Sequence, residues 1–445
     1  MKTHFDRLWQ ALDILFVTGL AAAMFLGGKV TPLLLVVGVL PIPFLLHALK
    51  GRSLPVPIWT VVVPSTFYFA YALLVFFWFT GLNPSDPRPV NPSLEYYAVA
   101  IAMLGVGVVR GLQVRHLAHL FHKLMPLLLV GCFLLLTALM FAEIRDACRV
   151  RGLAPWPFIP ALLFSTLALL SLVGWEKMNR SERLTRLAIL ALSVVVSTTY
   201  TGSRGVTVAQ VCVFSFFCLL NLWPPLRNKI PSCPQFLSAG FSGLALSLVL
   251  GIATDCGPAS RFSSTFQTLE TMVSRLMTPA LQTREGVTAL SSEQKTNDAA
   301  NHEALAPVVE TTADEAIEHR LAMWQTSIAA IWEKPVFGHG SLYLQKLIAA
   351  PYGYEHNHNQ YLTWLVTGGI VQLTLGIFFL AIPWFVSVGL PLADRLLLTL
   401  AVSLLWGTAM MFDSFLSLKF YTHYYCLLCG ILFAWCNSMR EAAEA

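Results

Sequence analysis

The chain has 445 residues, of which 56% are hydrophobic and only 12% are charged, about half the share of charged residues in soluble domains. The net charge of +5 is spread over many loops, which argues against the basic cluster that a nucleic-acid-binding protein needs. Most of the nine cysteines lie in apolar runs, with neither zinc-site spacing nor the framework of a secreted disulfide-rich domain.

Apolar runs long enough to cross about 30 Å of hydrocarbon recur along the whole chain. They predict an all-α polytopic membrane protein with about twelve transmembrane helices. The first run lacks a small-residue cleavage site, so we expect a retained helix rather than a signal peptide. We expect the spans, within several residues, at 12–27, 30–49, 56–80, 94–109, 124–142, 158–174, 184–199, 206–222, 236–254, 360–382, 396–411 and 421–437.

Lysine and arginine set the expected orientation, because they accumulate on the cytoplasmic side of membrane proteins. With a cytoplasmic N-terminus, fifteen of the 29 basic residues fall in cytoplasmic segments and seven in the short outer loops. The loop at 145–151 is the one clear exception. We therefore expect both termini inside, helices 1–9 in residues 1–254, a long outer loop at 255–359, and helices 10–12 with a short cytoplasmic tail in residues 360–445. In a bacterium with two membranes, that loop faces the periplasm.

The long outer loop combines a soft, polar middle with ordered ends, and loops of this length are usually functional or disordered. A helix is possible at 265–281, and the stretch 283–300 is rich in Ser, Thr, Glu and Asn. Towards its end, apolar residues at three- and four-residue spacing predict an amphipathic helix: Leu321, Trp324, Ile328, Ile331 and Trp332. Pro335 ends this helix, and Gly338 and Gly340 predict a turn.

Two arginines on the expected outer side are candidate anion ligands. Arg204, with Ser203 before it and Gly205 after it, begins an apolar helix, where the helix dipole and unbonded N–H groups favour an anion. Its guanidinium could clamp a phosphate or diphosphate; the alternative is a snorkelling arginine that marks the membrane interface. Arg320 lies near the start of the amphipathic helix, where a solvated surface charge is the alternative.

Two histidines, His356 and His358, directly precede the span at 360–382. A neutral imidazole there could act as a general base towards an attacking hydroxyl. A metal pair is the less favoured reading, because no Asp- or Cys-rich companion and no H-E-x-x-H spacing accompanies them. Interfacial histidines without a role remain a further alternative. Asn359 could hold the ring tautomer or a sugar hydroxyl. Asp413, expected at the outer end of the penultimate span, could orient a histidine or bind an acceptor, or be a plain loop carboxylate.

In these motifs the sequence resembles the O-antigen ligase and O-antigen polymerase superfamily. The resemblance rests on the T-G-S-R-G turn before a transmembrane helix, followed by H-R-L-x-M-W, P-V-F-G-H-G, H-N-H-N-x-Y-L-x-W-L and G-G. In motif terms it covers residues 199–369, and in topology and length the whole chain. The polar middle of the outer loop matches nothing in the family pattern.

The resemblance implies a GT-C-like helical fold and a multi-pass protein of the bacterial inner membrane with its active site facing the periplasm. It implies an inverting glycosyltransferase without metal or other cofactor. The donor would be an O-antigen glycan on undecaprenyl diphosphate, and the acceptor a sugar hydroxyl of lipid A–core. Arg204 and Arg320 match the arginines that hold the diphosphate, and His358 matches the essential histidine; His356 and Asp413 match less closely.

Three other functions stay open from the sequence. An O-antigen polymerase or a protein O-oligosaccharyltransferase of the same superfamily would use the same donor with another acceptor. A transporter of an anionic lipid-linked glycan would use the arginines for binding alone, although the sequence shows neither inverted repeats nor broken helices near the midplane. A purely structural membrane protein would not need these arginines and histidines on one side.

Overall fold

The computed structural model describes residues 56–79, 91–113, 117–143, 158–253, 313–352 and 356–444. These residues form helices, turns and loops, with no strand among them. The predicted spans 12–27 and 30–49, the possible helix 265–281 and the polar stretch 283–300 lie outside the described residues. The chain divides into two compact units, Ala259–Met323 and the remainder. The fold below is that of the larger unit.

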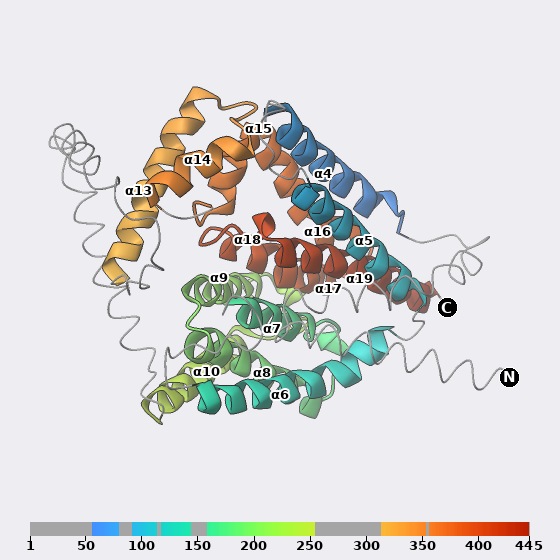
Figure 1. The fold of residues 1–445 in the computed structure, drawn as a ribbon. Helices are drawn as coiled ribbons and strands as arrows, with labels where there is room; N and C mark the ends of the chain where they lie inside the picture. Colours follow the sequence, from blue (N-terminus) through green and yellow to red (C-terminus); the bar gives the residue numbers. More distant parts are fainter. Residues whose placement is uncertain are drawn as a thin grey trace. The chain divides into compact units, whose positions relative to one another are not determined.

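Helices make up almost all of the described chain (Figure 1). They are, in order, α4 (Trp59–Phe79), α5 (Asn91–Gln113), α6 (Leu117–Glu143), α7 (Phe158–Leu170), α8 (Arg180–Val195), α9 (Arg204–Leu220), α10 (Cys233–Ala253), α13 (Ala313–Glu333), α14 (Ser341–Tyr352), α15 (Gln360–Leu380), α16 (Ile382–Val386), α17 (Leu392–Thr399), α18 (Leu405–Ala409) and α19 (Lys419–Glu444). α14 was not expected from the sequence, whereas α13 and its end before Pro335 confirm a helix there. The predicted apolar face is wrong in part, because Ile328 and Trp332 are exposed and α13 instead buries Met323, Ser327 and Ala330.

Several helices have the length and composition of membrane spans. Among the described residues, four stretches are long and apolar enough to cross a bilayer: Arg180–Tyr200, Cys233–Ile252, Gln360–Leu380 and Leu392–Ala409. Shorter apolar helices accompany them, at Trp59–Val75, Tyr97–Val108, Leu124–Leu139, Phe158–Leu170 and Arg204–Leu220. These helices confirm a multi-pass membrane protein in its coarse form.

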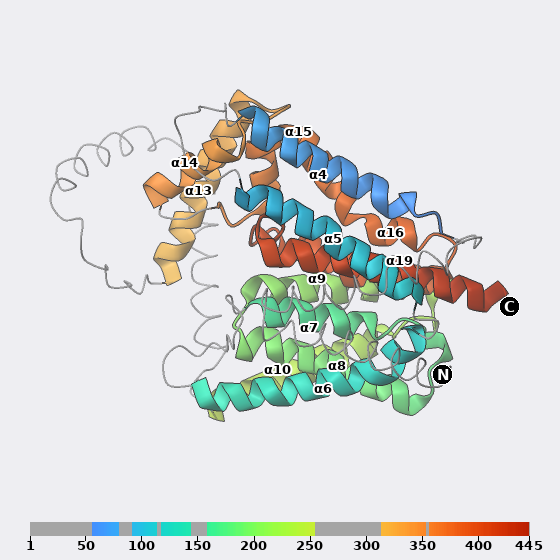
Figure 2. The ribbon, with the colours of Figure 1, turned by 45° about the vertical axis from the view of Figure 1, so that its right-hand side comes forward.

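Glycines allow α5 and α19 to pack closely along their length, as Figure 2 shows. A methyl group at Gly107 of α5 would overlap the carbonyl oxygen of Leu427, and one at Gly430 of α19 would lie 2.7 Å from the backbone nitrogen of Val108. Small residues at helix contacts are typical of membrane proteins, because in lipid the helices associate through van der Waals packing instead of the hydrophobic effect.

Helices α7, α8 and α9 share a buried polar contact around Gln210. Its Nε2 donates to Ser165 Oγ (2.7 Å) on α7 and to Ser193 Oγ (3.1 Å) on α8, and its Oε1 accepts from Ser197 Oγ (2.7 Å). The buried amide of Gln210 thus has hydrogen-bond partners for both its nitrogen and its oxygen, as buried polar groups generally do. This contact lies directly behind the turn that leads into α9, so it fixes where α9 begins.

Helix α15 confirms the predicted span at 360–382 in position, but it is sharply bent, so the expectation from the sequence that no helix is broken is wrong. Gly369 interrupts the helix with φ 66° and ψ −161°, a backbone conformation essentially restricted to glycine. The indole of Trp364 packs against Gly376, where an added methyl group would lie 2.6 Å from the ring. A straight helix would hold these two residues about 18 Å apart. The two halves of α15 therefore fold towards each other.

The predicted turn after α13 holds this bend by backbone hydrogen bonds. Gly338 (φ 66°) and Gly340 (φ 89°) both adopt the left-handed conformation, which confirms the turn. The His339 N–H donates to the carbonyl of Val366 (2.7 Å) and the Gly340 N–H to that of Thr367 (2.8 Å). On the far side of the bend, the Ile370 N–H donates to the carbonyl of Pro335 (2.9 Å). The turn at 335–340 and α15 are thereby joined at the bend.

The ends of the helices meet as the predicted topology requires. On the expected cytoplasmic side, the Val56 N–H donates to Asn437 Oδ1 (2.8 Å) and the Gly174 N–H to Asp394 Oδ1 (2.8 Å). On the opposite side, the Gln360 N–H donates to the carbonyl of Met410 (2.9 Å). The pairing of ends agrees with the expected topology, and the assignment of one side to the periplasm stays a prediction.

The bend at Gly369 provides a test of the fold. We expect Gly369→Ala to lower the thermal unfolding midpoint of the detergent-solubilised protein by about 1–3 °C or more, because the strained backbone alone costs about 1–3 kcal/mol and the new methyl group would overlap the Val336 carbonyl. Gly131→Ala on α6 is the matched control, since nothing lies within 4 Å of its added methyl group. Equal midpoints for the two variants would contradict the bent geometry.

Candidate active site

Helix α9 begins with Arg204 after a tightly constrained turn. α8 starts with a capping box, in which Asn179 and Glu182 bond each other's backbone N–H groups, and it ends in a π-helical turn, Val196–Tyr200. Gly202 has φ 57°, and the Ser203 N–H donates back to the carbonyl of Ser197 (2.8 Å). The connection is therefore a short, ordered turn, as the sequence predicted.

The start of α9 packs against the segment that carries Asp413. A methyl group at Gly205 would lie 2.8 Å from Cβ of Phe412, so only glycine lets the two backbones approach this closely. The missing side chain of Gly205 thus makes room for Phe412. Because Arg204 precedes Gly205 and Asp413 follows Phe412, the structure brings these two predicted site residues into the same neighbourhood.

The loop that carries the histidines is anchored by Asn357, which is fully buried. Its Oδ1 accepts from Thr363 Oγ1 (2.7 Å) and the Asn359 N–H (3.2 Å), and its Nδ2 donates to Ser327 Oγ (3.3 Å). Its backbone carbonyl accepts from Trp324 Nε1 (2.8 Å). A side chain bonded on every side is a rigid support, and here it stands between the two histidines.

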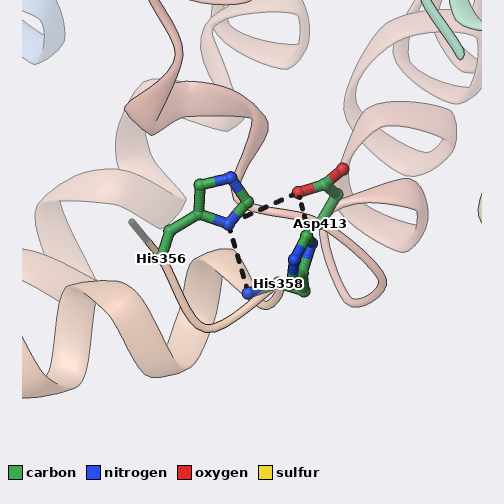
Figure 3. Close-up of side chains that lie close together, drawn as sticks. All are labelled: His356, His358 and Asp413. Carbon is green, nitrogen blue, oxygen red and sulfur yellow. Dashed lines mark hydrogen bonds and ion pairs between the residues drawn. The ribbon is translucent and has the colours of Figure 1, made fainter. Parts of the chain in front are cut away.

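His356, His358 and Asp413 converge, as Figure 3 shows. His358 has φ 52°, an uncommon conformation for a residue other than glycine, and its N–H donates to Nδ1 of His356 (3.3 Å). The two rings lie 4.5 Å apart at 73°. Oδ1 of Asp413 lies 3.4 Å from Nδ1 of His358 and 3.8 Å from Nδ1 of His356. The structure thus unites three residues that the sequence proposed separately.

The carboxyl group of Asp413 is buried but stays acidic. Burial acts to raise its pKa, but the contact with His358, the positive charges that both histidines carry when protonated and the Ser414 N–H (2.8 Å) act in the opposite direction and prevail. The pKa of Asp413 therefore lies below its ordinary value, and the side chain is a carboxylate at neutral pH. Ser414 is in turn bonded to Thr363 (2.9 Å), so the carboxylate is held by the same network as Asn357.

The hydrogen bonds indicate which ring nitrogens carry protons. Nδ1 of His356 accepts from a backbone N–H, so it holds no proton in this arrangement. A carboxylate only accepts, so Asp413 favours a proton on Nδ1 of His358, its nearest neighbour at 3.4 Å. Nε2 of His358 is then the unprotonated nitrogen. A histidine oriented in this way by a carboxylate is arranged to accept a proton.

The remaining predicted site residues have different outcomes. Asn359 caps α15, because its Oδ1 accepts from the N–H groups of Tyr361 and Leu362, so the expected role in holding a ring tautomer falls to Asp413. Ser203 is the N-cap residue of α9 but makes no side-chain capping bond. Arg320 belongs to the other compact unit, Ala259–Met323, so its part in this site stays a prediction.

Sequence reasoning missed the residues that hold the loop in place. Asn357 stands between two histidines and looked like a spacer, and Trp324 and Ser414 looked like ordinary helix and loop residues. Only Asn357 gave a local signal, since an amide followed by a helix start often bonds nearby backbone. Its partners on α13, Trp324 and Ser327, come from a distant part of the chain and carry no such signal.

The low pKa of Asp413 leads to a test by pH. A group whose pKa is lowered on folding stabilises the protein above its unfolded pKa, about 3.9 for aspartate, and loses that effect as the pH falls through the folded value. The difference in unfolding midpoint between wild type and Asp413→Asn should therefore persist from pH 8 to pH 5 and vanish only below about pH 4. A difference lost between pH 7 and pH 5 would contradict an ionised, buried Asp413.

Comparison with known proteins confirms the family resemblance. A family model described as O-antigen ligase matches residues 187–377, a range that includes Arg204, Arg320, His356 and His358 but ends before Asp413. No curated protein gives a significant match to the chain. Members of this family are glycosyltransferases that act on lipid-linked glycans. Residues 187–377 of this chain are therefore a domain of the O-antigen ligase family.

Proposed function

We propose that this protein is an O-antigen ligase of the bacterial inner membrane. It transfers a glycan en bloc from undecaprenyl diphosphate to a sugar hydroxyl of lipid A–core on the periplasmic face, with inversion and without a metal cofactor. The observation that carries the proposal is the carboxylate-oriented histidine, His358 with Asp413 at 3.4 Å, next to the start of α9. The family domain supports a lipid-linked glycan as the donor.

The proposed reaction is a single displacement at the anomeric carbon of the donor. Nε2 of His358 accepts the proton of the acceptor hydroxyl while the hydroxyl oxygen bonds to the anomeric carbon. The bond between the carbon and the diphosphate oxygen breaks, and undecaprenyl diphosphate leaves on the opposite face, which inverts the configuration. Asp413 stabilises the imidazolium that forms, as the carboxylate does in Ser-His-Asp enzymes.

Arginine provides the stabilisation that the leaving group needs. A guanidinium can bond two diphosphate oxygens at once, and it is aimed at the charge that develops as the bond breaks. Arg204 is the first residue of α9, whose N–H groups and dipole also favour an anion. Gly205 keeps this helix start close to Phe412 and Asp413. We propose that Arg320 provides a second guanidinium and that His356 assists His358.

The acceptor and the role of His358 can be tested in one assay. The purified full-length protein is given undecaprenyl-diphosphate-linked glycan and lipid A–core in the presence of EDTA. We expect glycan on lipid A–core with wild type, and a rate lower by about 10²–10⁴-fold with His358→Ala. Lengthened lipid-linked chains instead would indicate a polymerase, glycan on a protein acceptor an O-oligosaccharyltransferase, and movement across vesicles without transfer a transporter.

The role of Arg204 requires a control for charge. We expect Arg204→Ala to lower kcat by about 10²–10³-fold at saturating donor, because a donor to the developing charge is lost. Arg183→Ala removes the same charge from α8, where Arg183 lies 5.3 Å from the centre of the Trp175 ring and bonds the carbonyl groups of residues 175 and 176. It should leave kcat unchanged. If Arg204→Ala keeps full turnover at saturating donor, the proposed diphosphate contact is wrong.

A further inference from the structure

The site has the composition and spacing of a three-ligand metal site. One ring nitrogen of His356, one of His358 and a carboxylate oxygen of Asp413 all lie within 4.8 Å of one another. The sequence argued against a metal because the histidine pair lacked an acidic companion. The structure provides that companion in Asp413, which lies 55 positions after His358 and beyond the end of the family domain, so the acidic ligand is present after all.

The distances fit a tetrahedral ion. Zinc binds histidine nitrogen and carboxylate oxygen at about 2.0–2.2 Å, which places neighbouring ligand atoms of a tetrahedron about 3.3–3.5 Å apart. The two measured distances to Asp413 Oδ1 are 3.4 Å from His358 and 3.8 Å from His356. The two histidine nitrogens lie within 4.8 Å of each other, so an ion would draw the two rings together, and a fourth position would stay open.

The ligand types select the kind of ion. Two imidazoles and one carboxylate suit zinc and neighbouring transition ions, whereas magnesium and calcium prefer oxygen ligands alone. The side chains of His356, His358 and Asp413 are 17%, 16% and 9% exposed, so the site is enclosed but has access from solvent.

We propose that this cluster binds a divalent transition ion of the zinc class, and that the bound ion inhibits transfer. The inhibitory part rests on the proposed function. An imidazole that gives its Nδ1 lone pair to a metal carries its remaining proton on Nε2. His358 would then have no lone pair left to accept the proton of the acceptor hydroxyl, and Asp413 would face the ion instead of the ring. Metal binding and general-base catalysis therefore use incompatible forms of the same histidine.

Binding is measured first, independently of activity. Purified full-length protein, stripped with EDTA and dialysed, competes for Zn²⁺ with a chromophoric chelator. We expect one wild-type site that Asp413→Asn and His356→Gln each weaken at least tenfold, because loss of even an outer-shell partner costs about 10–100-fold. Zn²⁺ should also raise the unfolding midpoint of wild type, which shows that the folded protein binds it.

A matched control separates this site from other histidines and carboxylates. Glu333→Gln makes the same change from carboxylate to amide, at a carboxylate 3.8 Å from His339, and it should leave Zn²⁺ affinity unchanged. Both Asp413→Asn and His356→Gln are first checked for folding by their unfolding midpoints; if one fails to fold, the other decides. Equal Zn²⁺ affinity in wild type and in the folded site variants would overturn the proposed site.

Activity then tests the inhibition. Transfer by wild type should fall as buffered free Zn²⁺ rises through the measured dissociation constant, and EDTA should restore it. Binding without any effect on transfer would overturn the inhibitory part, and stimulation by Zn²⁺ would overturn both it and the metal-free mechanism. If no transfer occurs under any condition while binding still depends on Asp413 and His356, the metal site stands and the proposed function fails.

Discussion

A buried carboxylate imposes the strictest requirement on this structure, because a charge removed from water needs donors or cations around it. Asp413 meets that requirement with the nearby ring of His358, the Ser414 N–H and, when it is protonated, the ring of His356. The histidines lie on a different segment from Asp413, so the requirement can be met only if the fold holds the two segments together. The contacts of α13, α15 and the segment after α18 serve this end.

The bend in α15 is the main device that brings the histidine loop to Asp413. With the helix folded back at Gly369, its first half runs beside α18, where Tyr361 donates to the carbonyl of Gly407 (2.7 Å). The turn at 335–340 bonds both sides of the bend, and α13 reaches the loop through Trp324. The loop is thus held from α13, α15 and the segment after α18 at once. A site built from several rigid elements is more exact than one on a free loop.

One consequence concerns the chemistry that the site can perform. The donor of the proposed reaction carries a good leaving group, so the protein has to provide a base, a positioned hydroxyl and compensation for the departing charge. A carboxylate-oriented histidine beside an arginine-bearing helix start has the parts for this. The same parts bring together three metal-ligating atoms, so a single arrangement accounts for both the proposed catalysis and its proposed inhibition by zinc.

The sequence by itself determined the class of protein and the residue types of the site. The composition and the length of the apolar runs predicted membrane helices, because backbone groups in lipid must bond one another and few structures other than helices allow this. Local signals also placed the turn at Gly338 and Gly340, the start of α9 at Arg204 and the two histidines, since turn and helix-start chemistry is encoded within a few residues.

Tertiary structure alone decided which of these residues act together. The sequence could not show that Gly369 bends α15, because a glycine inside an apolar run looks the same in a straight helix. Nor could it pair Asp413 with His358, or reveal Asn357 as the support between the histidines, since their partners lie far away in the chain. Periodicity and capping report on neighbours within a few positions, whereas the burial of a charge is decided by contacts between distant segments.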